Sequence, residues 1–144
     1  MQTTVTAIVL AAFCAVASAQ MTPVGTWHTV DDKTGEIKSE IRIVESGGAL
    51  SGSIAKVLSK NAKADAVCDH CTDDRKDKPM VGLQIIRGGK KLDDKEVWEG
   101  GRILDPENGK TYALRLTPVE SGAKLEVRGS IGPFGRTQTW VRAK

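Results

Sequence analysis

Residues 111–131 read TYALRLTPVESGAKLEVRGSI, and this stretch decides the fold class. Apolar residues occupy every second position of 112–116, and they do so again at 125–127. A period of two is typical of strands that have one buried face and one solvated face. Glu-Ser-Gly at 120–122 supplies a tight reversal between the two runs. The stretch therefore predicts two neighbouring antiparallel strands.

In the rest of the chain, turn signals also separate segments that have the pattern of strands. Turn signals rich in Gly, Asp or Asn recur about every ten to fifteen residues, with alternating segments between them. At 105–109, Asp-Pro-Glu-Asn-Gly combines a proline of fixed φ with an Asn-Gly pair suited to positive φ. A short helix is expected near Asn61–Val67. About eight strands are predicted, over Val24–Val30, Glu36–Glu45, Ala49–Ser59, Met80–Arg87, Glu96–Leu104, Thr111–Thr117, Lys124–Ile131 and Arg136–Arg142.

Short strands with local connections predict an all-β fold, namely a single antiparallel up-and-down barrel. Closing the sheet removes the exposed edges that an open sheet would have to protect. A flattened sandwich of two sheets is the alternative. A barrel of about eight strands is either filled by side chains or wide enough for one small ligand. One segment, Lys60–Pro79, interrupts the strand pattern, and a loop of this length is typically functional or separately tied down.

The amino-terminal segment has the pattern of a cleavable export signal. Val5–Ala17 is an unbroken run of small and apolar residues, and Ala17-Ser18-Ala19 offers small residues to a signal peptidase. The run is too short to cross a bilayer, which takes about 20 residues, and no other long apolar segment follows. We therefore expect residues 1–19 to be a signal peptide. Residues 20–144 are then one mature domain, periplasmic or secreted, without a transmembrane segment.

The charged residues are distributed along the whole domain. The chain has 21 Lys and Arg and 18 Asp and Glu, which gives a formal net charge of +3. Nucleic-acid-binding proteins gather their positive charge on one face or one helix. The interspersed pattern therefore predicts a solvated surface and no nucleic-acid partner.

Cys68-Asp69-His70-Cys71 is the most conspicuous chemical motif. Its form is similar to the active site of disulfide isomerases, but it lies in a polar loop without the helix that lowers a thiol pKa there. A zinc site needs four ligands, and His28 is the only other imidazole. We predict a Cys68–Cys71 disulfide that staples the long loop, which suits an oxidising compartment. The spacing alone leaves metal binding and redox chemistry open.

No catalytic constellation stands out. The chain has two histidines and no Gly-x-Ser-x-Gly elbow, which argues against a Ser/His hydrolase. We expect no cofactor and no bound metal, and we favour a non-enzymatic protein. The candidate ligand-binding residues are the main aromatic side chains of the domain, although large aromatics in a small barrel also serve as a core plug. These residues are Trp27, Trp98, Tyr112 and Trp140.

Gly25-Thr26-Trp27 in the first predicted strand and Trp140-Val141-Arg142 in the last resemble the calycin pattern of lipocalins and avidins. The resemblance implies a lipocalin-like barrel in which the tryptophan of Gly-x-Trp packs under a basic residue of the closing strand. One end of the barrel is then sealed.

A longer resemblance covers nearly the whole mature chain. Trp98–Tyr112, Leu125–Gly132 and Gly135–Trp140 are similar to the motifs of a family of small exported bacterial proteins, the domain of unknown function 2147. It implies an envelope location and a β-barrel but no activity. Together with the fold analogy it suggests non-enzymatic binding of a small apolar or amphipathic ligand. A protein-interaction or structural module of the periplasm, with a solid barrel, is the alternative.

Overall fold

The computed structural model describes residues 21–144, so the signal peptide expected at residues 1–19 lies outside the described residues. Within this range the chain is all-β, apart from one turn of 3-10 helix at Glu120–Gly122. The strands are β1 (Gly25–Val30), β2 (Ile37–Ser46), β3 (Ala49–Val57), β4 (Gln84–Lys91), β5 (Trp98–Asp105), β6 (Lys110–Val119), β7 (Lys124–Ile131) and β8 (Phe134–Arg142). No helix of the described range is long and apolar enough to cross a membrane.

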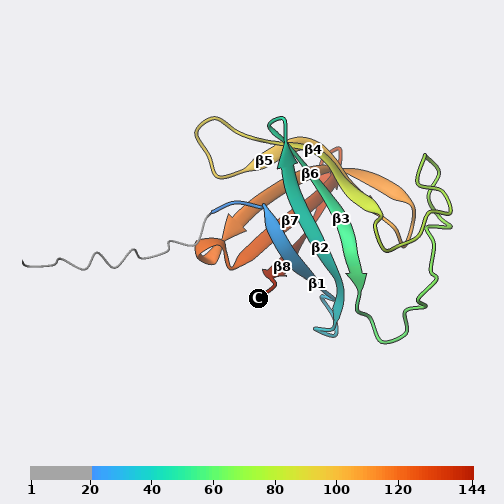
Figure 1. Cartoon of the computed structure of the whole chain (residues 1–144). Coiled ribbons are helices and arrows are strands. Elements are labelled where there is room, and N and C mark those ends of the chain that lie inside the picture. The colour runs from blue at the N-terminus through green and yellow to red at the C-terminus, as the bar shows by residue number, and fades with distance from the viewer. Residues whose placement is uncertain (1–20) are drawn as a thin grey trace, which may run out of the picture.

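The strands close into a barrel in the order of the chain, and every neighbouring pair is antiparallel (Figure 1). This confirms the predicted up-and-down barrel and excludes the sandwich. β1 and β8 pair only at Trp27 with Arg142 and at His28 with Val141. The barrel is therefore closed by a short seam between the middle of β1 and the end of β8.

Two local predictions were wrong. No helix forms at Asn61–Val67, where the chain makes turns instead. The strand predicted at Met80–Arg87 begins later, at Gln84, because Met80 to Leu83 form a turn. That strand also runs on to Lys91, through Gly88 at a φ of 89°, which glycine adopts without steric cost.

The core follows the two-residue period that the sequence indicates. Inward positions of all eight strands hold buried side chains, and all three tryptophans belong to this cluster. Trp27 is completely buried, and its Nε1 donates a hydrogen bond to the carbonyl of Pro23 at 2.7 Å. Apolar packing of this kind is the main source of stability in a small domain.

The two ends of the barrel differ. We call one end the Trp27 end. It holds the start of β1, the tight turns after β2 and β6, and the end of β8. The other end, here the loop end, holds the segments 31–36, 58–83, 106–109 and 132–133. The segment 58–83, green to yellow-green in Figure 1, extends to one side of the barrel.

Candidate functional site

The Trp27 end is sealed as the calycin resemblance implies. The guanidinium of Arg142 lies over the Trp27 ring, 4.2 Å from its centroid. Burial of Arg142 lowers its pKa. A desolvated cation over an indole face is a favourable contact. This end of the barrel is therefore packed too closely for a ligand to enter.

The predicted ligand-binding residues do not form one group. Trp27, Trp98 and Trp140 are buried in the core, whereas Tyr112 is half-buried toward the loop end. Among residues 21–144, the Trp140 Nε1 is the one buried side-chain donor without a hydrogen-bond partner. Buried indole N–H groups usually have an acceptor, so an acceptor placed beside Trp140 Nε1 would stabilise the protein.

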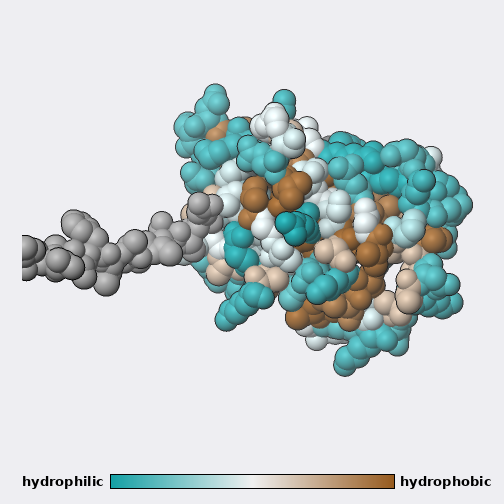
Figure 2. Space-filling model, viewed as in Figure 1, coloured by the Kyte–Doolittle hydropathy of each residue, from teal (hydrophilic) through white to brown (hydrophobic). Residues whose placement is uncertain are grey.

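Exposed apolar side chains gather at the loop end, and we call these residues the rim. Six of the nine large exposed apolar residues between 21 and 144 lie there, and Phe134 is 79 % exposed. The rim comprises Ile37, Leu58, Val67, Val81, Ile131 and Phe134. Figure 2 shows hydrophobic surface over the start of β2 and the end of β3, beside the segment that follows β3. Grouped exposed apolar residues are typical of binding surfaces, whereas single ones are not informative.

A hollow of about 540 Å³ opens among rim residues where β2 begins and β3 has ended. Ile37 and Leu58 supply its apolar wall, and Thr34, Glu36 and Lys60 supply polar groups. It is open to solvent and presents a mixed apolar and polar surface.

Polar groups follow below the rim on the inner face of the barrel. Thr29 and Ser39 share a hydrogen bond of 2.7 Å, and each lies two residues from a buried core position. The hydroxyl of Tyr112 accepts a hydrogen bond of 3.0 Å from the side-chain amide of Asn108. The interior therefore changes from apolar at the Trp27 end to partly polar at the loop end.

Ion pairs link segments of the loop end that are distant in sequence. Lys38 Nζ lies 2.6 Å from Glu107 Oε1, and this hydrogen bond raises the pKa of Lys38. Arg136 Nη2 lies 2.5 Å from Asp32 Oδ2, and this contact raises the pKa of Arg136. These pairs join β2 to the turn after β5, and β8 to the turn after β1. They are exposed, so each stabilises the fold only slightly.

Residues 68–79, the second part of the long segment Lys60–Pro79, are tied down, as the length of that segment suggested. Cys68 and Cys71 form the predicted disulfide and are buried in the core cluster. The side chain of Arg75 is 8 % exposed and donates to the Gln84 carbonyl at 2.8 Å and to Asp73. Because their sulfurs are joined, neither cysteine is a thiolate ligand. Within residues 21–144, no three His, Cys, Asp or Glu side chains are grouped as a metal site.

A second anchor joins this segment to the barrel. Asp74 accepts hydrogen bonds of 2.9 and 3.1 Å from Arg87 on β4, and these lower the pKa of Asp74. The backbone of His70 lies against Gly109, where an added Cβ would collide with the His70 carbonyl. The segment 68–79, which contains the disulfide, is thus packed against both β4 and the turn after β5.

Sequence reasoning missed the rim. Its residues are scattered between positions 37 and 134, and single exposed apolar residues are common on any surface. One local signal was present, because Ile131 and Phe134 flank the short turn Gly132-Pro133.

The comparisons with known proteins agree with this fold. Residues 25–142 match the model of a family described as uncharacterised proteins conserved in bacteria, DUF2147. Among solved structures, protein HP1028 from Helicobacter pylori, described as belonging to the lipocalin family, is similar with a TM-score of 0.72. The two sequences are 21 % identical, and the match covers 87 % of this chain and 85 % of that one. No curated protein matches the sequence.

Proposed function

Because this chain belongs to the DUF2147 family and folds as a lipocalin-like barrel, we propose that it is an exported protein that binds a small apolar or amphipathic molecule at the loop end. Export is supported by the signal pattern of residues 1–19 and by the Cys68–Cys71 disulfide, which is a bond of oxidising compartments. The bacterial envelope is the compartment that fits both features.

The observation that carries the proposal is the concentration of exposed apolar side chains on the rim. Barrel mouths are common ligand sites, because the strands hold the loops rigidly around a concave opening. Ile37 and Leu58 line a hollow at this opening. An apolar group placed there would remove both side chains from water.

The polar groups next to the rim indicate the character of the ligand. The paired hydroxyls of Thr29 and Ser39 and the phenol of Tyr112 lie on the inner face of the same end. Glu36 and Lys60 add charge to the hollow. A ligand with an apolar body and one polar group matches this surface better than a pure hydrocarbon does.

A second candidate function has its own supporting observation. Two hollows, of about 600 and 540 Å³, both open onto the surface, and the barrel interior holds three buried tryptophans. A filled barrel with an apolar rim also suits a protein-interaction module of the envelope. In that case the rim contacts a protein and not a small molecule.

A fluorescent apolar probe tests the first function. We expect N-phenyl-1-naphthylamine to bind the purified domain of residues 20–144 and its fluorescence to increase. Ile37→Asp places a charge in the hollow and should weaken binding about tenfold or more. Val44→Asp is the matched control, because Val44 is 41 % exposed on the other end of β2 and Ile37 is 43 % exposed. Equal weakening by both substitutions would contradict a site at the rim.

Native mass spectrometry separates the two functions. Protein purified gently from the envelope of its own host should carry a reproducible added mass if it binds a small ligand. A bare chain that co-purifies with a second protein would favour the interaction module. Absence from the envelope fraction would contradict the proposed export.

A further inference from the structure

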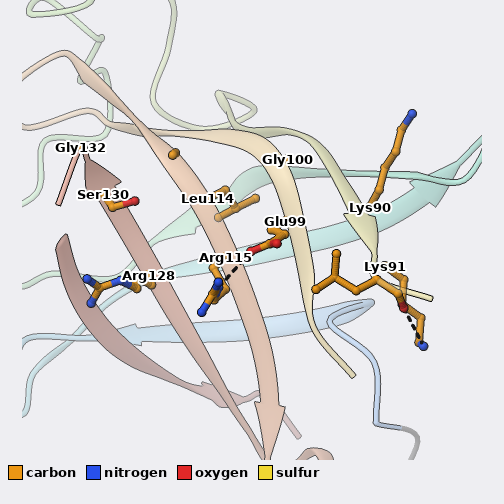
Figure 3. A pocket seen from close by; sticks show the side chains of 11 residues that line it. Lys90, Lys91, Glu99, Gly100, Leu114, Arg115, Arg128, Ser130 and Gly132 are labelled. Atoms are coloured by element: carbon orange, nitrogen blue, oxygen red, sulfur yellow. Dashed lines mark hydrogen bonds and ion pairs between the residues drawn. The ribbon is translucent and has the colours of Figure 1, made fainter. Parts of the chain in front are cut away.

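A second hollow, of about 600 Å³, lies on the outer wall of the barrel, away from the inner face described above. It extends across β4, β5, β6 and β7. Figure 3 shows two arginines on neighbouring strands at one side of this hollow and two lysines at the other. Its charged residues are Lys90, Lys91, Arg115, Arg128 and a single carboxylate, Glu99.

Arg115 on β6 and Arg128 on β7 are directly opposite each other in the strand register. Side chains at such positions stand about 5 Å apart at their Cβ atoms, and like charges placed there repel each other. Glu99 compensates one of them, because its Oε2 accepts a hydrogen bond of 3.0 Å from Arg115 Nε. Arg128 Nη1 lies 3.4 Å from the Thr137 hydroxyl, and the Arg128 guanidinium lies against Gly135 on β8. Arg128 has no carboxylate within 4.0 Å among residues 21–144.

Small residues leave the surface between the cations open. Gly100 and Ala113 line the hollow, and a Cβ added at Gly100 would meet nothing within 4 Å. The register of β5 is irregular between Glu99 and Arg102, which allows the backbone to bend there. Among the residues that line the hollow, Glu99 is the one long side chain between Arg115 and Lys90, and beside it the glycine and alanine leave the wall open to a ligand group.

We propose that this outer hollow binds the phosphate group of a ligand, with Arg115 and Arg128 as its principal contacts. A phosphate dianion would be attracted to both cations, and the planar N–H donors of a guanidinium match its oxygens in bidentate geometry. Lys90, which takes part in no ion pair within residues 21–144, adds positive charge on the opposite side. This site adjoins the rim at Gly132 but uses other side chains, and it is independent of the proposed function.

Thermal unfolding in inorganic phosphate tests the site. We expect millimolar phosphate to raise the melting temperature of the domain, compared with sodium chloride at equal ionic strength, because a ligand that binds the folded state stabilises it. The double variant Arg115→Gln/Arg128→Gln should bind phosphate about tenfold or more weakly. Arg42→Gln/Lys63→Gln removes the same charge outside the hollow and should bind as the parent protein does. Equal effects of the two double variants would overturn the proposal.

Two further measurements complete the test. The first asks whether the variant folds, and its urea midpoint should stay close to that of the parent protein, because the Arg115–Glu99 ion pair that it loses is exposed and contributes little. The second uses vesicles of phosphatidylglycerol and of phosphatidylcholine to identify the source of the phosphate. Arginine-dependent binding to phosphatidylglycerol only would assign a lipid headgroup, whereas a response to free phosphate without vesicle binding would assign a soluble phosphorylated molecule. No response in either arm would overturn the site.

Discussion

The guanidinium of Arg142 caps the Trp27 ring and also donates hydrogen bonds to three backbone carbonyls. The Arg142 Cζ lies 4.2 Å from the centroid of the Trp27 ring. The carbonyls are those of Thr22, Val24 and Gly122, whose oxygens lie 2.7 to 3.0 Å from the guanidinium nitrogens. These acceptors precede β1 or follow β6, so one side chain joins three parts of the sealed end. Since β1 and β8 share only two residue pairs, this arginine supports the closure of the barrel.

Replacing Arg142 should therefore destabilise the fold markedly. We expect Arg142→Ala to lower the free energy of unfolding by about 3 kcal/mol, because three part-buried carbonyls lose a charged donor. Arg142→Lys keeps the charge over Trp27 but cannot reach all three carbonyls, so about half of that loss is expected. Urea unfolding followed by tryptophan fluorescence measures both. An unchanged midpoint for the alanine variant would contradict this role.

Trp27 itself should behave as a core plug. Trp27→Ala should cost about 3–5 kcal/mol of stability, because the side chain is completely buried. Trp27→Phe keeps an aromatic ring but loses the hydrogen bond to Pro23, so a smaller cost is expected. Circular dichroism during urea unfolding would compare the two variants. A midpoint unchanged by the alanine substitution would instead favour a role in lining a ligand cavity.

The Cys68–Cys71 disulfide should stabilise its own segment more than the whole fold. It closes a loop of only a few residues, and in the chain-entropy model such a loop contributes about 2 kcal/mol. The variant Cys68→Ser/Cys71→Ser should therefore remain folded but exchange the amide hydrogens of residues 67–80 faster. Hydrogen exchange with mass spectrometry measures this change. Peptide mapping without reductant should first find the two cysteines joined, and two alkylatable thiols would contradict the bond.

Acid should loosen the same segment through Asp73. Hydrogen bonds from the Arg75 side chain and backbone hold the pKa of Asp73 at about 2. A carboxyl whose pKa is lowered by folding contributes stability above its unfolded pKa and loses it as the pH falls through the folded value. The window is therefore roughly pH 4 to 2. The contribution is modest, because the Asp73 side chain is 41 % exposed.

Reduction of the buried disulfide by a phosphine can report on this loosening. The rate for the parent protein should increase between pH 4.5 and 2, relative to an Asp73→Asn variant measured at the same pH. The variant lacks the titrating carboxyl and should be reduced faster than the parent already at pH 4.5. A constant ratio of the two rates over this range would show that Asp73 does not hold the segment.

Most of the strand order was predictable from local sequence. The alternation of 112–116 and 125–127 recurs as inward-facing positions of β6 and β7, paired across the Glu120–Gly122 turn. Strand β4 was displaced in the prediction because Met80 to Leu83 are apolar yet form a turn, held by hydrogen bonds that include one from Gly82 to Ile54. That bond joins residues 28 positions apart in the printed sequence, so no local pattern encodes it.

The surfaces where binding is proposed could not be predicted in this way. The charges appear interspersed along the chain, yet the barrel places Arg115 opposite Arg128 and brings Lys90 to the same hollow. The order of the charged residues along the chain therefore did not predict the cationic surface on the outer wall. The three tryptophans, which from the sequence were candidates either for ligand contacts or for a core plug, are all buried in the core.

The sequence by itself determined most of the strands and turns, because these depend on a period of two and on turn chemistry. The resemblance to calycins implied the sealed end, and the short spacing of Cys68 and Cys71 favoured the disulfide. Only the tertiary structure decided the rim and the outer hollow. Lys38 and Glu107 lie 69 residues apart, and Asp32 and Arg136 lie 104 apart, yet both pairs meet at the loop end. Closure of the barrel sets these distances, since the register and tilt of eight strands fix which distant residues share a surface.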